Sequence, residues 1–327
     1  MTSITRRTAV GGLAAAAVPF VMGTGARAQG LPSQITIVVP FPPGGSTDAL
    51  ARLVQVGLQT KLNATIIIEN KSGGVGAIGA NQAARAKPDG STFLVTFDSH
   101  AVIPALIEKP PLDIEKDLVP VILVGTAPYV VACNTKRDWK TFADAVAAAK
   151  QPSGIVSYAS IGLGTISHLT MAALTKKIGT EMVHVPFKGG GPAVVDVTAG
   201  HVDMVCGSAA LLLPHITGGK LRPIMQFGKE RLSALKDVPT AIESGFAGFE
   251  AVAWWGVFTA AGTPPAIVAQ VEKAFRETCS EPTIATRLKE TQQMNLTLEG
   301  PEPFDKFFKT QISTGGKFVR DNNIKAE

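Results

Sequence analysis

The chain has 327 residues, enough for two domains of ordinary size. Hydrophobic residues make up 45% and charged residues 17%, which is a globular composition and excludes an intrinsically disordered chain. The net charge is +5, but the first 28 residues hold three arginines and no acid, so the remainder carries 28 basic and 26 acidic residues, a net charge of +2. Because the chain also has no run of Lys and Arg with interleaved aromatic residues, we expect no nucleic-acid partner.

The N-terminal segment, residues 1–28, has the pattern of an export signal. Arg6 and Arg7 precede the short apolar stretch Val10–Val21, and Ala26–Ala28 forms a small-x-small cleavage site before Gln29. The apolar stretch is shorter than the roughly 20 residues of a membrane span, which disfavours a retained anchor. The arginine pair is typical of a twin-arginine signal, and an ordinary secretory signal remains the alternative. Both routes lead out of the cytoplasm.

The next part of the chain alternates strands, glycine-rich turns and helices. Ile35–Val39 is a predicted strand, and Pro40–Asp48 leads from it into a helix. This helix has apolar residues at the i, i+3, i+4, i+8 spacing: Leu50, Leu53, Val54 and Leu58. The strand Thr65–Ile68 precedes a helix at Ala77–Ala86, and the strand Phe93–Phe97 ends in Asp98-Ser99-His100.

The same unit repeats in the middle of the chain, after Pro120–Gly125 and Tyr129–Cys133, two strands predicted to lead into a second lobe. The further predicted strands are Ile155–Ser160, Met182–Phe187, Val202–Cys206 and Trp254–Phe258. Helices are predicted after Gly164 and after Gly191, and in the tail near 265–279, 283–293 and 303–321. Alternating strands and helices predict an α/β fold with mostly parallel sheets flanked by helices, one sheet in each of two lobes. We place lobe 1 at 34–125 plus 255–327 and lobe 2 at 126–254.

Three strand-to-helix junctions carry glycines: Gly44-Gly45, Gly162 with Gly164, and Gly189–Gly191. A helix start presents unpaired N–H groups and about half a positive charge, and glycine lets a ligand approach the backbone. Each junction alone is typical of a tight turn. Together they predict an anion site at the carboxyl ends of parallel strands, with Lys188 placed to attract the anion.

Motifs for other chemistry are missing from the sequence. There is no phosphate-binding P-loop and no dinucleotide fingerprint, and neither H-E-x-x-H nor G-x-S-x-G occurs. The histidines are not spaced as metal ligands, so we expect no metal, no cofactor and no catalytic residues. A hydrolase could use Ser160 or Ser167 as nucleophile with His168 as base, and Asp98 could also act as a general base; we interpret His168 and Asp98 as residues that order loops. The three cysteines are interpreted as small buried hydrophobes.

An ordered set of motifs resembles the Bug (Bordetella uptake gene) family, the substrate-binding receptors of tripartite tricarboxylate transporters. The resemblance covers about residues 34–320. The motifs are Pro40–Asp48, Asn70–Gly76, Lys87–Gly90, Val185–Ala193, Pro214–Pro223, Asp237–Thr240 and Ala261–Pro264. Two segments depart from the family pattern: Ile161 and Leu163 are apolar, and Cys206–Ser208 replaces a frequent Asp-Asn pair.

The resemblance implies a type II periplasmic-binding-protein fold of two lobes joined by a hinge of crossing strands. It implies a periplasmic monomer that captures a small carboxylate, a di- or tricarboxylate or an aromatic acid, through backbone amides and waters, and binds the transporter subunits transiently. A sensor that presents the ligand to a membrane signalling receptor is the alternative partner, and the hydrolase is the third function considered. The predicted ligand-binding residues are Pro43, Gly44, Gly45, Thr47, Asp48, Ser99, Ser160, Gly162, Gly164, Thr165, Lys188, Gly189 and Gly190.

Overall fold

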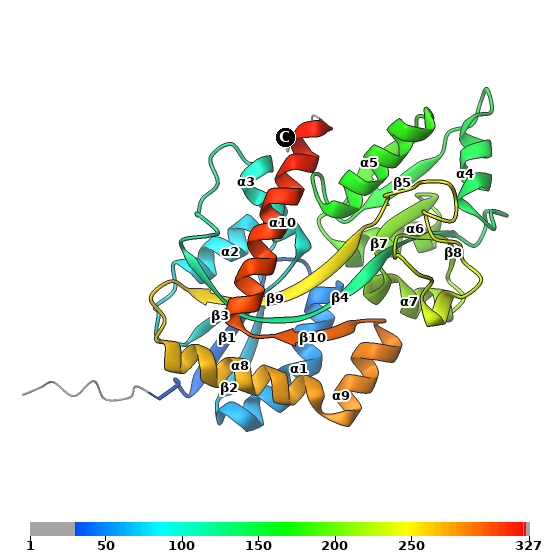
Figure 1. Ribbon diagram of the computed structural model, residues 1–327. Coiled ribbons are helices and arrows are strands. Elements are labelled where there is room, and N and C mark those ends of the chain that lie inside the picture. Colours follow the sequence, from blue (N-terminus) through cyan, green and yellow to red (C-terminus); the bar gives the residue numbers. More distant parts are fainter. Residues whose placement is uncertain (1–29, 323, 325–327) are drawn as a thin grey trace, which may run out of the picture. The chain divides into compact units, whose positions relative to one another are not determined.

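The computed structural model describes residues 30–322 and 324, so the predicted export signal lies outside the described part. Residues Leu31–Glu327 group as one compact unit. Its strands and helices alternate along most of the chain, which confirms the predicted α/β fold (Figure 1). Among the helices of the described part, none combines the length and the apolar character that a membrane span requires.

The first part of the sheet runs in the order β2-β1-β3-β9-β4, with β10 on the far side of β4. Its strands are β1 (Gln34–Val39), β2 (Thr65–Asn70), β3 (Thr92–Phe97), β4 (Leu118–Asn134), β9 (Val252–Ala260) and β10 (Asn295–Glu299). Its helices are α1 (Ser46–Leu62), α2 (Ala77–Ala84), α3 (Ile103–Leu106), α8 (Pro265–Ser280), α9 (Pro282–Thr286) and α10 (Pro301–Asp321). Short turns of helix are η1 (Gly74–Gly76), η2 (Asp98–Val102) and η4 (Arg287–Thr291). The predicted inner face of α1 is buried at Leu50, Val54 and Leu58.

The second part of the sheet runs in the order β4-β7-β5-β6, and β8 pairs with β4. Its further strands are β5 (Ser157–Ser160), β6 (Val183–Pro186), β7 (Met204–Ser208) and β8 (Leu221–Gln226). Its helices are α4 (Phe142–Ala149), α5 (Ile166–Ile178), α6 (Gly190–Ala199) and α7 (Ala209–Thr217), with the short turn η3 (Ser233–Leu235). Among the named strands, β1 pairs in parallel with β2 and β3, and β5 with β6 and β7; a single parallel bridge also joins Gln226 to Thr240. Every pairing of β4 or β9 is antiparallel.

The strand β4 links the two parts of the sheet. It pairs with β9 as far as Pro128 and, from Tyr129 onward, with β7 and β8. β4 is therefore one continuous strand that includes both predicted strands, Pro120–Gly125 and Tyr129–Cys133. It is continuous because its pairing with β7 begins at the residue after its pairing with β9 ends. The predicted lobe boundaries, 125/126 and 254/255, fall inside β4 and β9. The division into lobes stays a prediction. A hinge of crossing strands requires one strand to pass through each boundary, and β4 and β9 do so.

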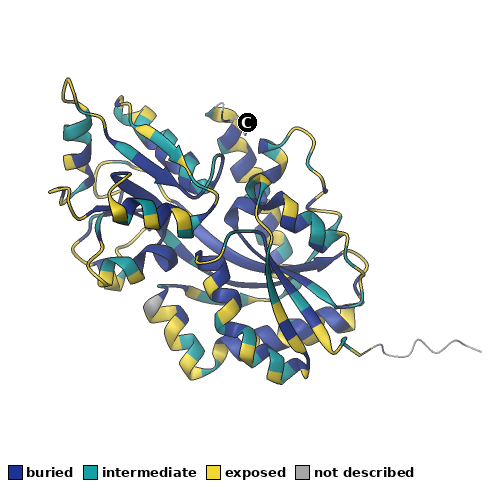
Figure 2. Ribbon diagram, turned by 180° about the vertical axis from the view of Figure 1, so that it is seen from behind, coloured by how far each residue is buried: buried dark blue, intermediate teal, exposed yellow. Residues whose placement is uncertain are grey.

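The core forms on both faces of β9. Trp254 packs against Phe304 and Phe308 of α10, with ring centroids 5.9 and 5.8 Å away. Trp255 points to the opposite face, where its ring lies 5.2 Å from that of Phe97. Both tryptophans are fully buried, and the strands around them are buried along most of their length (Figure 2). Core packing therefore accounts for both tryptophans.

The C-terminal segment differs from the prediction in one helix. The helix expected near 283–293 is present, but only its first part is α-helical: α9 ends at Thr286, and η4 continues it as a π-helix to Thr291. Because a π turn holds one more residue than an α turn, the apolar spacing did not reveal it.

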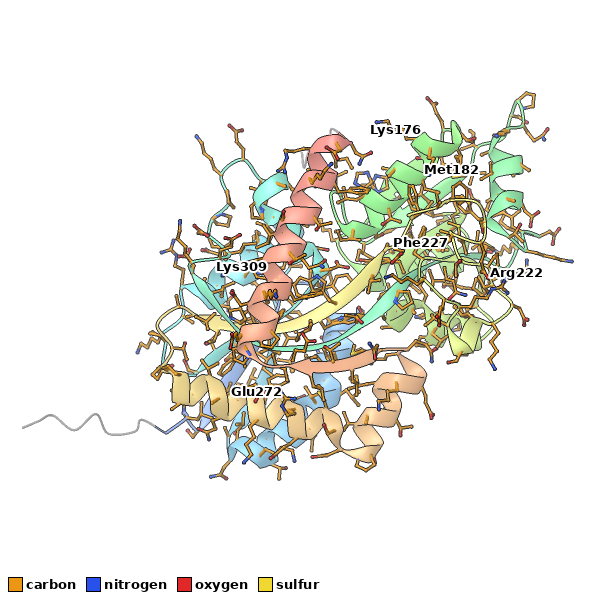
Figure 3. The ribbon with its side chains drawn as sticks, viewed as in Figure 1. Lys176, Met182, Arg222, Phe227, Glu272 and Lys309 are labelled. Carbon is orange, nitrogen blue, oxygen red and sulfur yellow. The ribbon has the colours of Figure 1, made fainter. Side chains whose placement is uncertain are left out.

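The long tail helices α8 and α10 carry ion pairs between residues one turn apart. Glu272 of α8 pairs with Arg276, and Lys309 of α10 pairs with Asp305 at 2.6 Å; Figure 3 labels Glu272 and Lys309.

Candidate functional site

Three loops follow parallel strands and lead into helices. The first loop, Pro40–Gly45, joins β1 to α1; the second loop, Ile161–Thr165, joins β5 to α5; the third loop, Phe187–Gly189, joins β6 to α6. Parallel strands place such loops at the same edge of a sheet, which is where α/β folds bind ligands. These loops contain the glycine junctions predicted from the sequence.

The first and third loops touch through their backbones. A Cβ atom on Gly189 would lie 2.7 Å from Cδ of Pro42, and one on Gly191 would lie 2.7 Å from the carbonyl oxygen of Pro43. Both distances are shorter than real Cβ contacts, so a larger residue at either position would push the loops apart. Gly189 also has a φ of 141°, which favours glycine. Glycine at these two positions permits the close approach of the two segments.

A small cavity of about 20 Å³ lies where these loops meet. The residues that begin three helices line it together: Gly45, the N-cap of α1; Gly189, the N-cap of α6; and Ser208, the N-cap of α7. The other lining residues are Phe41, Ser46, Thr47, Phe97, Ile161, Gly190 and Leu211. We call this space the small cavity.

The electrostatics of the small cavity favour an anion. Each helix N-terminus carries about half a positive charge, concentrated on N–H groups that have no partner within the helix. Neither Gly45 nor Gly189 supplies a side-chain cap, so the first-turn N–H groups of α1 and α6 are left for another acceptor. The volume of the small cavity suits a group of one or two oxygen atoms, since a cavity must offer about 10–15 Å³ to hold a single water molecule. A carboxylate meets both conditions.

A larger cavity of about 860 Å³ adjoins the small one, and Phe41 and Ile161 line both. We call it the large cavity. Its walls come from the second and third loops, from residues 72–76 around η1, and from residues 106–108 after α3. The volume lies within the range of about 300–1,000 Å³ that is usual for small-molecule sites. Together the two cavities form the candidate binding site.

The predicted site residues divide into three groups. Those at the small cavity are Gly45, Thr47, Gly189 and Gly190. Those at the large cavity are Gly162, Thr165 and Lys188. The others, although all lie in the described part of the chain, line neither of these two cavities: Pro43, Gly44, Asp48, Ser99, Ser160 and Gly164. Among these, Gly44, Asp48, Ser160 and Gly164 make hydrogen bonds that hold the first and second loops.

Asp48 holds the first loop in place. Its carboxylate accepts hydrogen bonds from the Gly44 amide, from Nε of Arg52 and from Nδ2 of Asn70, each 3.0 Å long. Burial acts to raise the pKa of this carboxyl, but the hydrogen bonds from Arg52, the Gly44 amide and Asn70 outweigh it and hold the pKa below its usual range. Asp48 is therefore ionised at neutral pH, and we assign it a positioning role.

Replacing Asp48 by alanine is expected to lower the free energy of unfolding by about 1–2 kcal/mol, because charged hydrogen bonds to the loop are lost. Carboxylate affinity should fall by a few-fold as the loop loosens. Urea unfolding and calorimetry measure the two effects. Asp305→Ala is the matched control, since it removes an exposed i, i+4 pair with Lys309 but no loop contact. Equal effects of the two substitutions would contradict the positioning role.

Two histidines support the second loop. Nδ1 of His168 accepts the Gly164 amide at 3.0 Å, which confirms the loop-supporting interpretation of His168. Its ring stacks on that of His184 at 4.0 Å between centroids, and Nε2 of His184 lies 2.7 Å from Oγ of Ser160. Burial, with a contribution from His168, lowers the pKa of His184 to about 4, and burial lowers that of His168. Both rings are therefore neutral at neutral pH.

The hydrolase candidates lie in buried positions. Ser160 is fully buried and is the partner of His184, not of His168; its Oγ also donates to the carbonyl oxygen of Gly162 at 3.0 Å. Asp98 is buried and accepts hydrogen bonds from the hydroxyls of Tyr129 and Ser99, at 2.8 and 3.2 Å. Burial raises the pKa of Asp98 to about 8. Within the described residues, no group of three or more His, Cys, Asp and Glu side chains could hold a metal.

The comparisons with known proteins agree with this arrangement. A sequence profile described as the tripartite tricarboxylate transporter family receptor, TctC, matches residues 50–324. The chain belongs to this family. BugT of Bordetella pertussis is 31% identical to it over 293 residues, which cover 89% of this chain and 90% of BugT. The resemblance to the Bug receptors is thereby confirmed.

Two solved structures of similar proteins contain ligands. MatC from Rhodopseudomonas palustris, solved with malate, has a TM-score of 0.81 and 30% identity, and the match covers 88% of this receptor and 98% of MatC. A second R. palustris protein, solved with adipate, has a TM-score of 0.84 and 26% identity, with 90% of this receptor and 98% of that chain covered.

Sequence reasoning missed two parts of this receptor's site. Ser208 follows a buried strand and precedes a helix, which is the sequence signal of an N-cap, but it was noted only as a departure from the family. Residues 72–76 were noted as a motif and not assigned to the site, although Ser72, Val75 and their glycine neighbours form one wall of the large cavity.

Proposed function

We propose that this protein is the extracytoplasmic solute-binding receptor of a tripartite tricarboxylate transporter, and that its ligand is bound through a carboxylate in the small cavity. The observation that carries the proposal is the meeting of the N-termini of α1, α6 and α7 at one cavity of carboxylate size. The malate and adipate in the two similar structures, both carboxylates, support the proposal.

Binding is proposed to proceed by closure of two lobes that turn about β4 and β9. The first loop belongs to one predicted lobe and the third loop to the other, so a carboxylate between them links both. Each charge-assisted hydrogen bond to backbone N–H groups contributes roughly 1.5–3 kcal/mol. Closure also creates a surface that a membrane partner can recognise. The receptor needs no catalytic residue for this cycle, and the buried positions of Ser160 and Asp98 favour binding over hydrolysis.

Export is part of the proposal. The receptor is proposed to reach the periplasm with residues 1–28 removed after Ala28, and to act there as a monomer. Mass spectrometry of the exported protein tests the cleavage, since a chain that retains residues 1–28 would contradict it.

A thermal-shift screen of residues 29–327 against a carboxylate library tests the binding function. A ligand at a hundredfold excess over its Kd stabilises the folded protein by roughly 2.7 kcal/mol, which raises the melting temperature measurably. The matching alcohols and amides serve as controls, because they lack the anionic group. If no carboxylate stabilises the protein more than its uncharged counterpart does, the proposed function is wrong.

A further inference from the structure

The wall of the large cavity indicates which kind of carboxylate fits. Apolar side chains dominate it, with Phe41 and Ile161 at the junction with the small cavity and Val75, Ile107, Leu163 and Phe187 farther out. A cavity of about 860 Å³ has room for a ligand body beyond the carboxylate group. An apolar group placed there contributes about 25 cal/mol for each Å² removed from water. The wall therefore favours a ligand with a bulky apolar body.

The polar groups of the same wall do not build a second anion site. Its charged side chains are Lys188 and Glu108, one of each sign, and both are exposed. The Thr165 hydroxyl is engaged, since it donates to the carbonyl oxygen of Gly162 at 2.7 Å. A second carboxylate on the ligand would meet only exposed groups, Lys188 with the opposite charge of Glu108 on the same wall and the Ser72 hydroxyl, and would otherwise leave water for an apolar surface, which costs free energy.

The backbone at Val75 is a second, independent observation. Val75 has φ of 54° and ψ of 28°, a left-handed conformation that a β-branched residue rarely adopts. Such a conformation costs roughly 1–3 kcal/mol and persists where the surroundings enforce it, often at ligand sites. Glycine would adopt it without strain, yet valine stands here and its side chain lines the large cavity. The Val75 side chain thus lies between the large cavity and the buried cluster that contains Val102 and Leu106, so it presents an apolar surface to a ligand.

From the wall and the strained valine together, we infer that the ligand is a monocarboxylate with a bulky apolar body, aromatic or branched aliphatic. Its carboxylate lies in the small cavity, and its body passes between Phe41 and Ile161 into the large cavity. Val75 and Leu163 are specificity-determining residues for that body. This inference rests on the proposed function, because it uses the small cavity as the carboxylate site.

Calorimetry of residues 29–327 with matched acids tests the inference. The probes are 3-phenylpropionate, adipate, malate and 3-phenylpropanol. We expect 3-phenylpropionate to bind at least tenfold more tightly than adipate or malate, and the alcohol to bind at least tenfold more weakly than 3-phenylpropionate. Tighter binding of adipate or malate would overturn the inference and leave the proposed function standing. If none of the three acids binds, the carboxylate receptor itself is in question, and the inference is overturned with it.

Two variants test the named residues. Val75→Asn places a residue that tolerates the left-handed conformation there, and Leu163→Asn makes the outer wall polar. Each is expected to weaken 3-phenylpropionate binding by about tenfold while adipate binding changes less than threefold. Because Val75 also packs against the buried cluster of Val102, Leu106, Leu169 and Val319, the melting temperature of the free Val75→Asn protein is measured first. If it falls, Leu163→Asn alone decides the test. Val195→Asn, on an exposed position of α6, is the control and should change neither affinity. Equal losses for both acids would overturn the assignment of these residues.

Discussion

Gly45→Val is expected to weaken carboxylate binding by at least tenfold, or roughly 1.4 kcal/mol. Gly45 lines the small cavity and begins α1, so a branched side chain there fills the space that the carboxylate would occupy. Its φ of −79° and ψ of 167° are readily adopted by valine. The nearest atom to an added Cβ is the carbonyl oxygen of Pro42 at 3.8 Å, an ordinary contact. Folding should therefore tolerate the change.

Gly300→Val is the matched control for this substitution. Gly300 is the N-cap of α10, has φ of −70° and, like Gly45, makes no side-chain cap bond. Both variants replace a glycine N-cap by a poor N-cap residue, so any shared loss of stability is measured by the control. Calorimetry with the best carboxylate of the screen, together with thermal unfolding of the free proteins, gives the comparison. A folded Gly45→Val protein that binds like the wild type would show that the first loop is only a turn.

Asp98→Asn is expected to remove a large pH dependence of stability. Burial raises the pKa of Asp98 to about 8 in the folded protein, whereas an exposed aspartate titrates near 3.9. Between these values the folded state retains a proton that the unfolded state has released, so this group lowers stability as the pH rises. From pH 5 to pH 8 the wild type should lose about 3–4 kcal/mol relative to the variant, at up to 1.36 kcal/mol per pH unit.

Urea unfolding of both proteins at pH 5, 6, 7 and 8 measures this difference. His100 acts in the opposite direction, because burial lowers its pKa to about 3, and its contribution to stability grows as the pH rises toward 6.5. That contribution is present in both proteins and cancels in the comparison. Asparagine resembles the protonated acid in shape and can accept the Tyr129 hydroxyl. Stability curves that run parallel would show that Asp98 does not titrate in this range.

Much of the site could be predicted because its signals are local. A buried strand followed by glycines and a helix start can be identified within about ten residues of sequence. This pattern predicts the junctions that contain Gly45, Gly189 and Gly190, whereas Thr47 is implied by the family resemblance. Their four positions share one small cavity in the structure. The positioning role of His168 was also local, since its ring reaches the amide of Gly164 four residues earlier.

The sequence by itself determined the alternation of strands and helices, the glycine junctions and the family. Tertiary structure decided which groups meet: Ser208 reaches the small cavity because β7 pairs with β4 and β5, and His184 reaches Ser160 because β5 pairs with β6. Strand pairing between segments far apart in the chain leaves no local periodicity, so these partners could not be read from spacing. The volume and apolar wall of the large cavity likewise depend on loops that only the packed sheet brings together.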